Sequence, residues 1–283
     1  MAQSRLIFGV WEPDSNEITG IGRMSQCVNV IPVKGGYKAI NGWGRATKDG
    51  GTAYSSTVWP GNASNVVGAY SAKDPNGDTI DFISTSTDVF SVSFSTGVVF
   101  AMSSPPTVVG AVPFREFAQY GNTIYTVAGH VSNNIKSYDM VAATGWIDAS
   151  SGYLRAKTVS VIRDFVVIGN TREDPSLYYY SRVKWSAYGN GADWTPAAST
   201  QSDYQDLNAE FGPVQRILGG NDAFVVCERG VAIMQYVGGD VIFNFTRVGS
   251  GCGLVGQHAC GILNDTVYWC GFNNFFTITG SGV

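Results

Sequence analysis

Four residues between positions 252 and 270 have side chains of the types that bind zinc. They are Cys252, His258, Cys260 and Cys270. Structural zinc sites usually contain two cysteines separated by about two to four residues. No such pair occurs in the sequence, and Cys270 ends the apolar run Val267-Tyr-Trp-Cys. We therefore expect buried structural thiols at these positions, with a metal site as the alternative.

Acidic residues raise the possibility of glycoside cleavage. The candidates are Glu173, Asp174, Asp203, Asp206 and Glu210. Glycosidases need two carboxyl groups at a defined separation, and the spacing of these five residues singles out no pair. The sequence also lacks a Gly-x-Ser-x-Gly nucleophile motif and a Gly-x-x-x-x-Gly-Lys-Ser/Thr phosphate loop. We expect no enzymatic activity and no cofactor, and glycan cleavage is kept as a minor alternative.

A cluster of aromatic residues could form a recognition surface. Tyr178-Tyr-Tyr180 is followed by Trp185 and Tyr188. Aromatic side chains dominate the binding energy of many interfaces, which makes a receptor-binding or glycan-binding module a second hypothesis. In the alternative interpretation, some of these side chains pack between structural units and the others meet a neighbouring subunit.

Composition and charge restrict the class of protein. Hydrophobic residues make up 44% of the 283 residues, charged residues 14%, and the net charge is −4. A low charge density suits a protein that packs against neighbours. Without a basic surface, tight binding of nucleic acid by phosphate neutralisation is not expected. DNA could still pass along such a protein without being held.

A recurring phrase organises the chain from about residue 66 onward. In this pattern a polar turn is followed by an apolar run with an aromatic residue, a glycine-containing turn and a second apolar run. The pattern is clearest at residues 117–128, 161–170, 219–230 and 263–272. The starts lie about 40 to 60 residues apart, as expected for propeller blades. We predict an all-β, β-propeller-like body with about five blades. Their expected ranges are 66–104, 112–150, 155–196, 212–247 and from 252 onward.

Local patterns predict how these blades are built. The apolar runs Val159–Ile168, Phe224–Cys227 and Thr266–Cys270 are expected to be buried on both faces. Asp74-Pro-Asn-Gly77 predicts a tight turn. In Asp193-Trp-Thr-Pro196 we expect Asp193 to cap the backbone and Trp194 to fill a gap between blades.

The first part of the chain has a different character. Residues 1–45 are irregular in pattern and predict an N-terminal arm, and residues 46–283 predict the propeller-like domain. No apolar run approaches the ~18 residues of a membrane-spanning helix, and the first residues do not resemble a secretory signal. We expect synthesis in a cytosol, where the five cysteines stay reduced.

Several strings in the sequence together resemble one family. The first part carries Cys27-Val-Asn-Val-Ile-Pro followed by Gly36-Tyr-Lys-Ala-Ile-Asn-Gly42. The central part carries, in order, Arg182-Val-Lys-Trp-Ser186, Asp193-Trp-Thr-Pro196, Gln201-Ser-Asp-Tyr-Gln-Asp-Leu207, Gly212-Pro-Val-Gln-Arg-Ile-Leu-Gly-Gly220, Glu228-Arg-Gly230 and Met234-Gln-Tyr-Val-Gly238. Their order and spacing resemble tail nozzle or hub proteins of short-tailed bacteriophages, the tail tubular and packaged-DNA stabilisation type. The resemblance is strongest over about 113–280.

This resemblance implies a function. Such proteins form a ring, commonly of six copies, below the portal and adaptor of the virion. The ring lines or closes the DNA exit channel and holds tail fibre or tip proteins. The chain is therefore expected to be a structural component of the virion tail that is assembled in the host cytoplasm. The phrase Tyr268-Trp-Cys-Gly-Phe departs from the family pattern, which reads as an aromatic strand followed by Asp-Gly-Phe.

Seven residues in the matching strings are our candidates for assembly contacts. They are expected at turns or strand edges, although contacts within the subunit are the alternative for several of them. The seven are Arg182, Trp185, Trp194, Asp203, Tyr204, Glu228 and Arg229.

Overall fold

The computed structural model describes two compact units, Met1–Ala53 and Tyr54–Val283. The described residues are 30–33, 36–39, 66–86, 88–93, 98–101, 114–129, 134–143, 145–264 and 266–279. In the first unit they form one antiparallel hairpin of β1 (Val30–Val33) and β2 (Gly36–Ala39). Most of the predicted arm, residues 1–45, lies outside the described residues, so its extent and its boundary with the second unit stay predictions.

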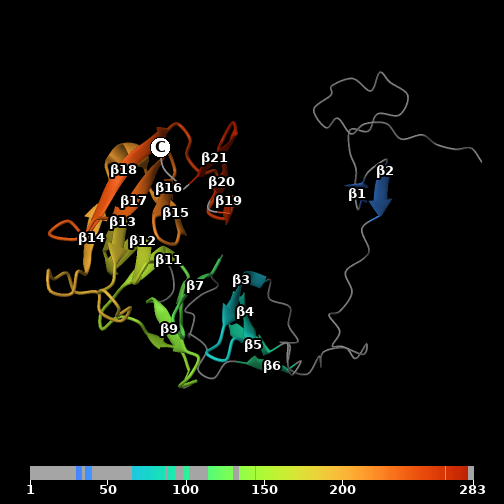
Figure 1. Cartoon of the computed structure of the whole chain (residues 1–283), viewed down its shortest axis with the longest axis horizontal. Helices are drawn as coiled ribbons and strands as arrows, with labels where there is room; N and C mark the ends of the chain where they lie inside the picture. The colour runs from blue at the N-terminus through green and yellow to red at the C-terminus, as the bar shows by residue number, and fades with distance from the viewer. Residues whose placement is uncertain are drawn as a thin grey trace, which may run out of the picture. The chain divides into compact units, whose positions relative to one another are not determined.

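The second unit consists of five antiparallel sheets that follow one another along the chain (Figure 1). The first sheet contains β3 (Val66–Lys73), β4 (Thr79–Thr85), β5 (Val89–Ser93) and β6 (Val98–Ala101). The second sheet contains β7 (Glu116–Tyr120), β8 (Thr123–Val127), β9 (Lys136–Asp139) and β10 (Ile147–Asp148). The third sheet contains β11 (Arg155–Ile162), β12 (Phe165–Asp174), β13 (Leu177–Trp185) and β14 (Asp203–Asp206). The fourth sheet contains β15 (Val214–Gly219), β16 (Ala223–Cys227), β17 (Gly230–Tyr236) and β18 (Phe243–Ser250). The last contains β19 (Cys260–Leu263), β20 (Thr266–Cys270) and β21 (Phe275–Thr279).

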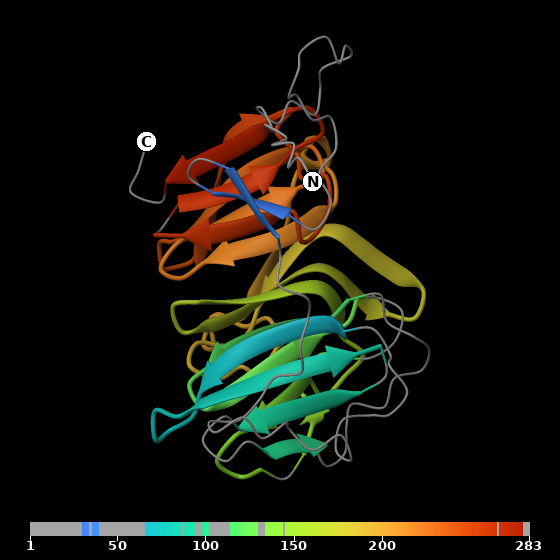
Figure 2. The same ribbon diagram turned by 90° about the vertical axis from the view of Figure 1, so that its right-hand side faces the viewer.

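The arrangement of these sheets is that of a β-propeller with five blades. Within each sheet, strands that are consecutive in the chain are neighbours. Neighbouring blades contact each other through their first strands, β3 with β7, β7 with β11, β11 with β15, and β15 with β19. No contact of similar extent joins β19 to β3 within the described part of the chain. Figure 2 shows the first blade (blue-green) and the fifth blade (red) as separate sheets. The predicted fold class is confirmed.

Apolar clusters between neighbouring blades form the core. The cluster between the third and fourth blades includes Phe165, Val225 and Met234, all fully buried. Gly169 lies on β12 of the third blade, where a side chain would collide with Val214 of the fourth blade. Each buried Å² of apolar surface contributes roughly 25 cal/mol, so these clusters stabilise the packing of one blade on the next.

Two turns match the sequence-based predictions. Gly77 has a φ of 87°, and the Asp74 carboxylate accepts hydrogen bonds from the backbone N–H groups of Asn76 and Asp78. The Asp193 carboxylate accepts a hydrogen bond from the N–H of Thr195 at 3.0 Å. Trp194 is buried in the cluster between the second and third blades, as expected. Both predictions are confirmed.

Three expectations about the blades are wrong. The run Val159–Ile168 is not one buried strand, because it crosses the β11–β12 turn, where Arg163 and Asp164 are exposed. The third blade does not end near residue 196, because β14 (Asp203–Asp206) adds a fourth strand whose residues are all exposed and carry no apolar alternation. The run Thr266–Cys270 is not buried on both faces, since Tyr268 is half exposed. The run at Phe224–Cys227 is fully buried, as expected.

Helices contribute little to the described residues. Their only helix is a single 3₁₀ turn, η1 (Ala209–Phe211). No helix in the described part of the chain is long and apolar enough to span a bilayer.

Candidate assembly surfaces on the third and fifth blades

Four of the seven candidate residues lie on two paired strands of the third blade. Arg182 and Trp185 are on β13, and Asp203 and Tyr204 are on β14. The strand register places Trp185 opposite Asp203 and Arg182 opposite Asp206. The sequence analysis selected these residues from separate strings, and strand pairing brings them together at the outer edge of the blade.

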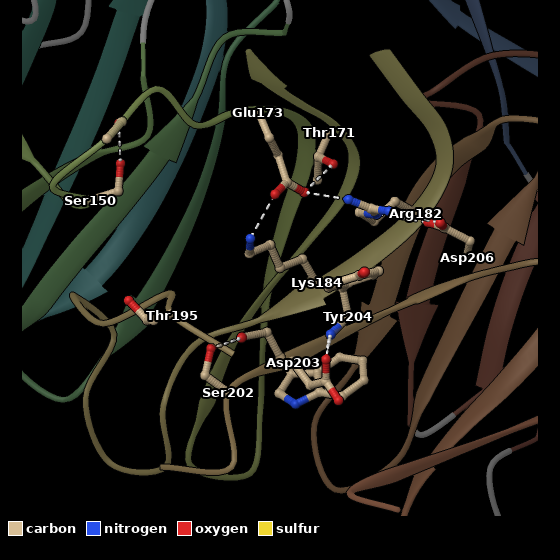
Figure 3. A network of polar contacts seen from close by, with 12 residues as sticks. Ser150, Thr171, Glu173, Arg182, Lys184, Thr195, Ser202, Asp203, Tyr204 and Asp206 are labelled. Atoms are coloured by element: carbon tan, nitrogen blue, oxygen red, sulfur yellow. Dashed lines mark hydrogen bonds and ion pairs between the residues drawn. The ribbon is translucent and has the colours of Figure 1, made fainter. Parts of the chain in front are cut away.

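Arg182 is the centre of this group (Figure 3). Its Nε and Nη2 donate to the two carboxylate oxygens of Asp206 at 2.7 and 2.8 Å, a bidentate pairing. The guanidinium carbon also lies 3.6 Å from the ring centre of Tyr179 and 3.8 Å from that of Tyr204. Such cation–π contacts gain strength when the cation is removed from water. Arg182 therefore ties β13 to β14 with both ion pairs and ring contacts.

Glu173 on β12 extends the network to a second cation (Figure 3). Its carboxylate accepts hydrogen bonds from Lys184 Nζ at 2.7 Å and from Arg182 Nη1 at 3.2 Å. Burial alone would raise the pKa of Glu173, but the bonds and charges of Lys184 and Arg182 outweigh burial and lower it. Glu173 is therefore an ionised, structural carboxylate.

The charges of this network balance. Arg182 and Lys184 carry two positive charges, and Glu173 and Asp206 carry two negative charges. Burial alone would lower the pKa of Arg182, but its bonds to Asp206 and Glu173 outweigh burial and raise the pKa. Arg182, Lys184 and Glu173 are largely buried, so removing one of them leaves an uncompensated charge and is costly, whereas Asp206 is half exposed. The network stiffens the outer half of the blade.

The acids considered for glycoside cleavage have other roles in the structure. Glu173 and Asp206 bond Arg182, while Asp174 caps the β12–β13 turn by accepting from the N–H of Ser176 at 2.8 Å. Glu210 pairs with Arg247 at 2.6 Å. A general acid needs a raised pKa, whereas the pKa of Glu173 is lowered.

An aromatic patch continues along the exposed side of the β12–β13 hairpin. The rings of Tyr178 and Tyr180 stack with centres 5.7 Å apart, and Arg172 lies 4.3 Å above the Tyr178 ring. Leu177 at the tip is also exposed. Tyr188 lies in a different loop and contacts Phe165. The cluster seen in the sequence is therefore divided between two places.

The two tryptophan candidates are buried within the protomer. Trp185 donates its Nε1–H to the Gln201 carbonyl at 2.8 Å and packs edge-on against Phe243 of the fourth blade. Trp194 donates to the Ala149 carbonyl at 2.9 Å, which ties the third blade to the second. Both tryptophans therefore stabilise the packing of the third blade against a neighbouring blade.

Glu228 and Arg229 occupy the turn between β16 and β17 of the fourth blade. Both are exposed, and Arg229 Nη2 donates to the Ala209 carbonyl at 2.9 Å. The hairpin expected from the sequence is present, but it lies on another blade than Arg182. The structure therefore does not join all seven candidates into one site.

The outer face of the fifth blade carries no charged residue, and its exposed apolar side chains alternate with threonines. Leu263, Tyr268 and Phe275 are exposed by 64%, 50% and 86%. Tyr268 pairs with Thr277 across the sheet, and none of β19, β20 and β21 contains a charged residue. The opposite face carries Val267, Trp269 and Phe276, which pack toward the fourth blade. The sequence analysis did not predict this surface, because the apolar run Thr266–Cys270 is typical of a buried strand.

A second polar cluster joins four blades where their first strands meet. Glu116 on β7 is almost fully buried, forms an ion pair with Arg216 on β15, and accepts the N–H of Val159 on β11 at 2.9 Å. Arg216 Nη1 lies 3.3 Å from Nδ1 of His258. Burial raises the pKa of Glu116, and the charge of Arg216 opposes this effect.

The sequence gives only a weak signal for this central cluster. Arg115 and Glu116 are two charged residues placed at the start of an apolar alternation. Nothing in the sequence spacing indicates that Glu116 would meet Arg216 and His258. The cluster links the blades to one another, and each of its members comes from a different one.

The zinc-type residues do not converge in the structure. Cys227, Cys252, Cys260 and Cys270 are free thiols, and the first two are buried. Burial raises the pKa of the Cys260 thiol to about 11, so it stays protonated. Within the described residues, no group of three or more His, Cys, Asp or Glu side chains could hold a metal ion.

Comparisons with known proteins support the fold. No protein-family model matches the sequence, and no curated protein matches it. The β-propeller domain of Cps50 (Swd1) from Myceliophteria thermophila aligns with a TM-score of 0.52 and 9% identity, over 79% of this chain and 72% of that chain. At this identity the likeness shows a shared β-propeller fold.

Two other solved structures align less closely. An auxiliary nutrient binding protein from Bacteroides thetaiotaomicron aligns with a TM-score of 0.47 and 9% identity, over 77% of this chain and 56% of that chain. The N-terminal domain of Nup159 aligns with a TM-score of 0.37 and 12% identity, over 65% of this chain. The aligned part spans about half of the Nup159 domain, 48%.

Proposed function

We propose that this protein is a non-catalytic structural subunit of a bacteriophage tail, of the nozzle or hub type. Its propellers would join into a ring that docks below the portal and adaptor and lines the DNA exit channel. The ordered strings between residues 182 and 238 support this family. The five-bladed fold supports a structural or binding role, because propellers serve many proteins as rigid scaffolds.

The outer face of the fifth blade carries the proposal. Leu263, Tyr268 and Phe275 extend into water from a sheet whose strands contain no charged residue. Soluble monomers rarely expose large contiguous apolar patches, and permanent interfaces between identical subunits are more apolar than transient ones. The occupant that we assign to this face is a second copy of the chain, because a closed ring repeats one contact between identical subunits.

The low charge of the chain fits the passage of DNA. The sequence contains 18 basic and 22 acidic residues. Tight binding of DNA depends on neutralising many phosphates with lysine and arginine. A channel built from this chain would guide the polyanion without holding it.

The test is the mass of the protein in solution, measured by light scattering and native mass spectrometry. The measurement is made on the protein alone and mixed with the portal and adaptor proteins of the same virion. We expect a ring-sized species, formed alone or on the adaptor ring. A protein that stays monomeric in both conditions would overturn the proposal.

Matched variants locate the contact. Tyr268→Ser with Phe275→Ser removes the two aromatic side chains from the fifth blade, and we expect this double variant to remain monomeric. Val141→Ser with Val241→Ser removes two other exposed apolar side chains, away from the fifth blade, and should leave the ring intact. Ring formation by both double variants would show that the fifth blade is not the interface.

A further inference from the structure

A pocket lies between the second blade and a loop of the third blade. Its volume is about 360 Å³. Tyr120, Tyr125, Ser137 and Asp139 from β7, β8 and β9 form one side, and Asn190 with its neighbours forms the other. None of these residues belongs to the two candidate assembly surfaces.

The loop that closes the pocket is fixed by its own hydrogen bonds. The N–H of Gly189 donates to the Asp164 carbonyl at 2.9 Å, and Gly189 has a φ of 70° that favours glycine. The Asn190 side chain accepts the N–H of Ala192 at 3.1 Å. At Gly191 a side chain would overlap the hydroxyl of Tyr125. The loop therefore holds the pocket in one shape.

Two largely buried side chains, Tyr125 and Ser137, bring hydroxyl groups to the lining of this pocket. Tyr125 and Ser137 are exposed by only 5% and 7%, and both line the pocket. Among the described residues, neither hydroxyl makes a hydrogen bond. A hydroxyl group both donates and accepts, so each of them can bond a polar ligand, or water, that occupies the pocket. Burial, reinforced by Tyr120, raises the pKa of Tyr125 to about 12, which keeps this hydroxyl able to donate.

The charges of the lining define the class of ligand. Asp139 is the one charged residue that lines the pocket among the described residues. Its Oδ1 accepts the N–H groups of Val141 and Ala142 at 2.8 and 3.2 Å. A pocket with a carboxylate and without lysine or arginine disfavours anions. Hydroxyl, amide and carboxylate groups beside tyrosine rings complement a neutral molecule with several hydroxyl groups.

We propose that this pocket binds one ring of a neutral saccharide. Its hydroxyl groups would donate to Asp139 and Asn190 and accept from Tyr125 and Ser137, while its apolar face lies against Tyr120. The volume is at the lower end of the range of ligand pockets, which suits one small ring. This site is independent of the proposed ring assembly.

The test is saturation-transfer NMR with a panel of free monosaccharides: glucose, galactose, mannose, rhamnose and N-acetylglucosamine. We expect at least one of them to bind the full chain, with a dissociation constant in the millimolar range. Ala192→Trp adds a bulky side chain at the exposed rim of the pocket and should abolish binding. Ser137→Ala removes one bonding hydroxyl and should weaken binding by about 3- to 10-fold.

Two control variants match these changes outside the pocket. Ala198→Trp and Ser71→Ala alter exposed positions and should leave saccharide binding unchanged. Absence of binding by all five sugars would overturn the proposal. Binding that survives Ala192→Trp, or that is lost equally in Ala198→Trp, would also overturn it.

Discussion

The third and fifth blades differ in the side chains that their outer surfaces present to water. The third blade has four strands, and its outer edge carries charges that are paired with one another around Arg182. The fifth blade has three strands in the described residues, and its outer face presents uncharged side chains to water. The polar edge of the third blade is already satisfied within the protomer. The fifth blade instead leaves Leu263, Tyr268 and Phe275 exposed, and these side chains would gain stability if a partner covered them.

The contrast predicts that variants of the third blade change the stability of the fold, whereas variants of the outer face of the fifth blade change association. Changes in the third blade should weaken the fold of the chain, because Arg182, Lys184 and Glu173 are largely buried and depend on each other. Changes on the outer face of the fifth blade should leave the protomer intact and alter only what binds there. The following variants test this separation, from the largest expected effect on stability to the smallest.

Arg182→Leu should have the largest effect. It leaves Glu173 and Asp206 without their shared cation and removes the group between Tyr179 and Tyr204. We expect the free energy of unfolding to fall by about 3–5 kcal/mol, measured by chemical denaturation of the monomeric form. Arg182→Lys keeps the charge but not the bidentate pairing, so it should lose less. Equal losses for both variants would show that the geometry of the guanidinium is unimportant.

Glu173→Gln should lower the free energy of unfolding by about 2–3 kcal/mol near neutral pH, because Lys184 loses its charged partner. The pKa of Glu173 is lowered from its ordinary value of 4.5 in the folded state. The ionised carboxylate therefore contributes stability above that pH, and the contribution is lost as the pH falls through the folded-state pKa.

The free energies of unfolding of the wild type and of Glu173→Gln should therefore become more similar as the pH falls into the acid range. Denaturation at a series of pH values below neutral measures both. Asp78→Asn, at the exposed turn between β3 and β4, serves as the control for the pH series. A difference between wild type and Glu173→Gln that stays constant down to strongly acid pH would contradict the assigned role.

Trp269→Phe tests the inner face of the fifth blade. Trp269 donates its Nε1–H to the Cys252 carbonyl at 2.6 Å and stacks on Phe276. Phenylalanine keeps a stacking ring but leaves the buried carbonyl without its donor, so we expect a loss of about 1–2 kcal/mol. Thermal and chemical denaturation measure it. An unchanged stability would mean that water replaces the indole as donor.

Phe275→Ser should have the smallest effect on the protomer. The side chain lies on the outer face and is 86% exposed. We expect the free energy of unfolding of the monomer to change by at most about 0.5 kcal/mol. A loss as large as that of Trp269→Phe would show that Phe275 is packed within the protomer, and it would remove the contrast between the two faces.

The parts of the fold that could be predicted depend on neighbours in the sequence. Alternating apolar residues and turn residues identify the blades, the turn at Gly77 and the hairpin at Glu228, because these features form between residues close along the chain. Trp194 was also placed correctly, since an aromatic residue beside a capping aspartate is typical of a turn that meets the next blade.

The remaining features depend on contacts that the sequence does not show. β14 is polar throughout and is fixed by its pairing with β13. Tyr268 looks like a core residue, and its exposure depends on which blade lies beside it. Glu116 meets Arg216 across 100 residues of sequence, and the pocket hydroxyls of Tyr125 and Ser137 come from separate strands. Of the candidate site, the sequence indicated Arg182 and Tyr204, and it indicated Glu173 and Asp206 only as candidate catalytic acids, not as partners of Arg182.

The order of the blades along the chain has a consequence for biosynthesis. Each sheet is made of consecutive strands, and each blade packs on the one before it. A nascent chain can therefore complete and dock one blade at a time as it leaves the ribosome, since domains and local units fold as they emerge. The fifth blade is translated after the other four. Its uncharged outer face therefore appears after the first four blades, which can already be packed by then, and this shortens the time in which that face could capture other unfinished chains.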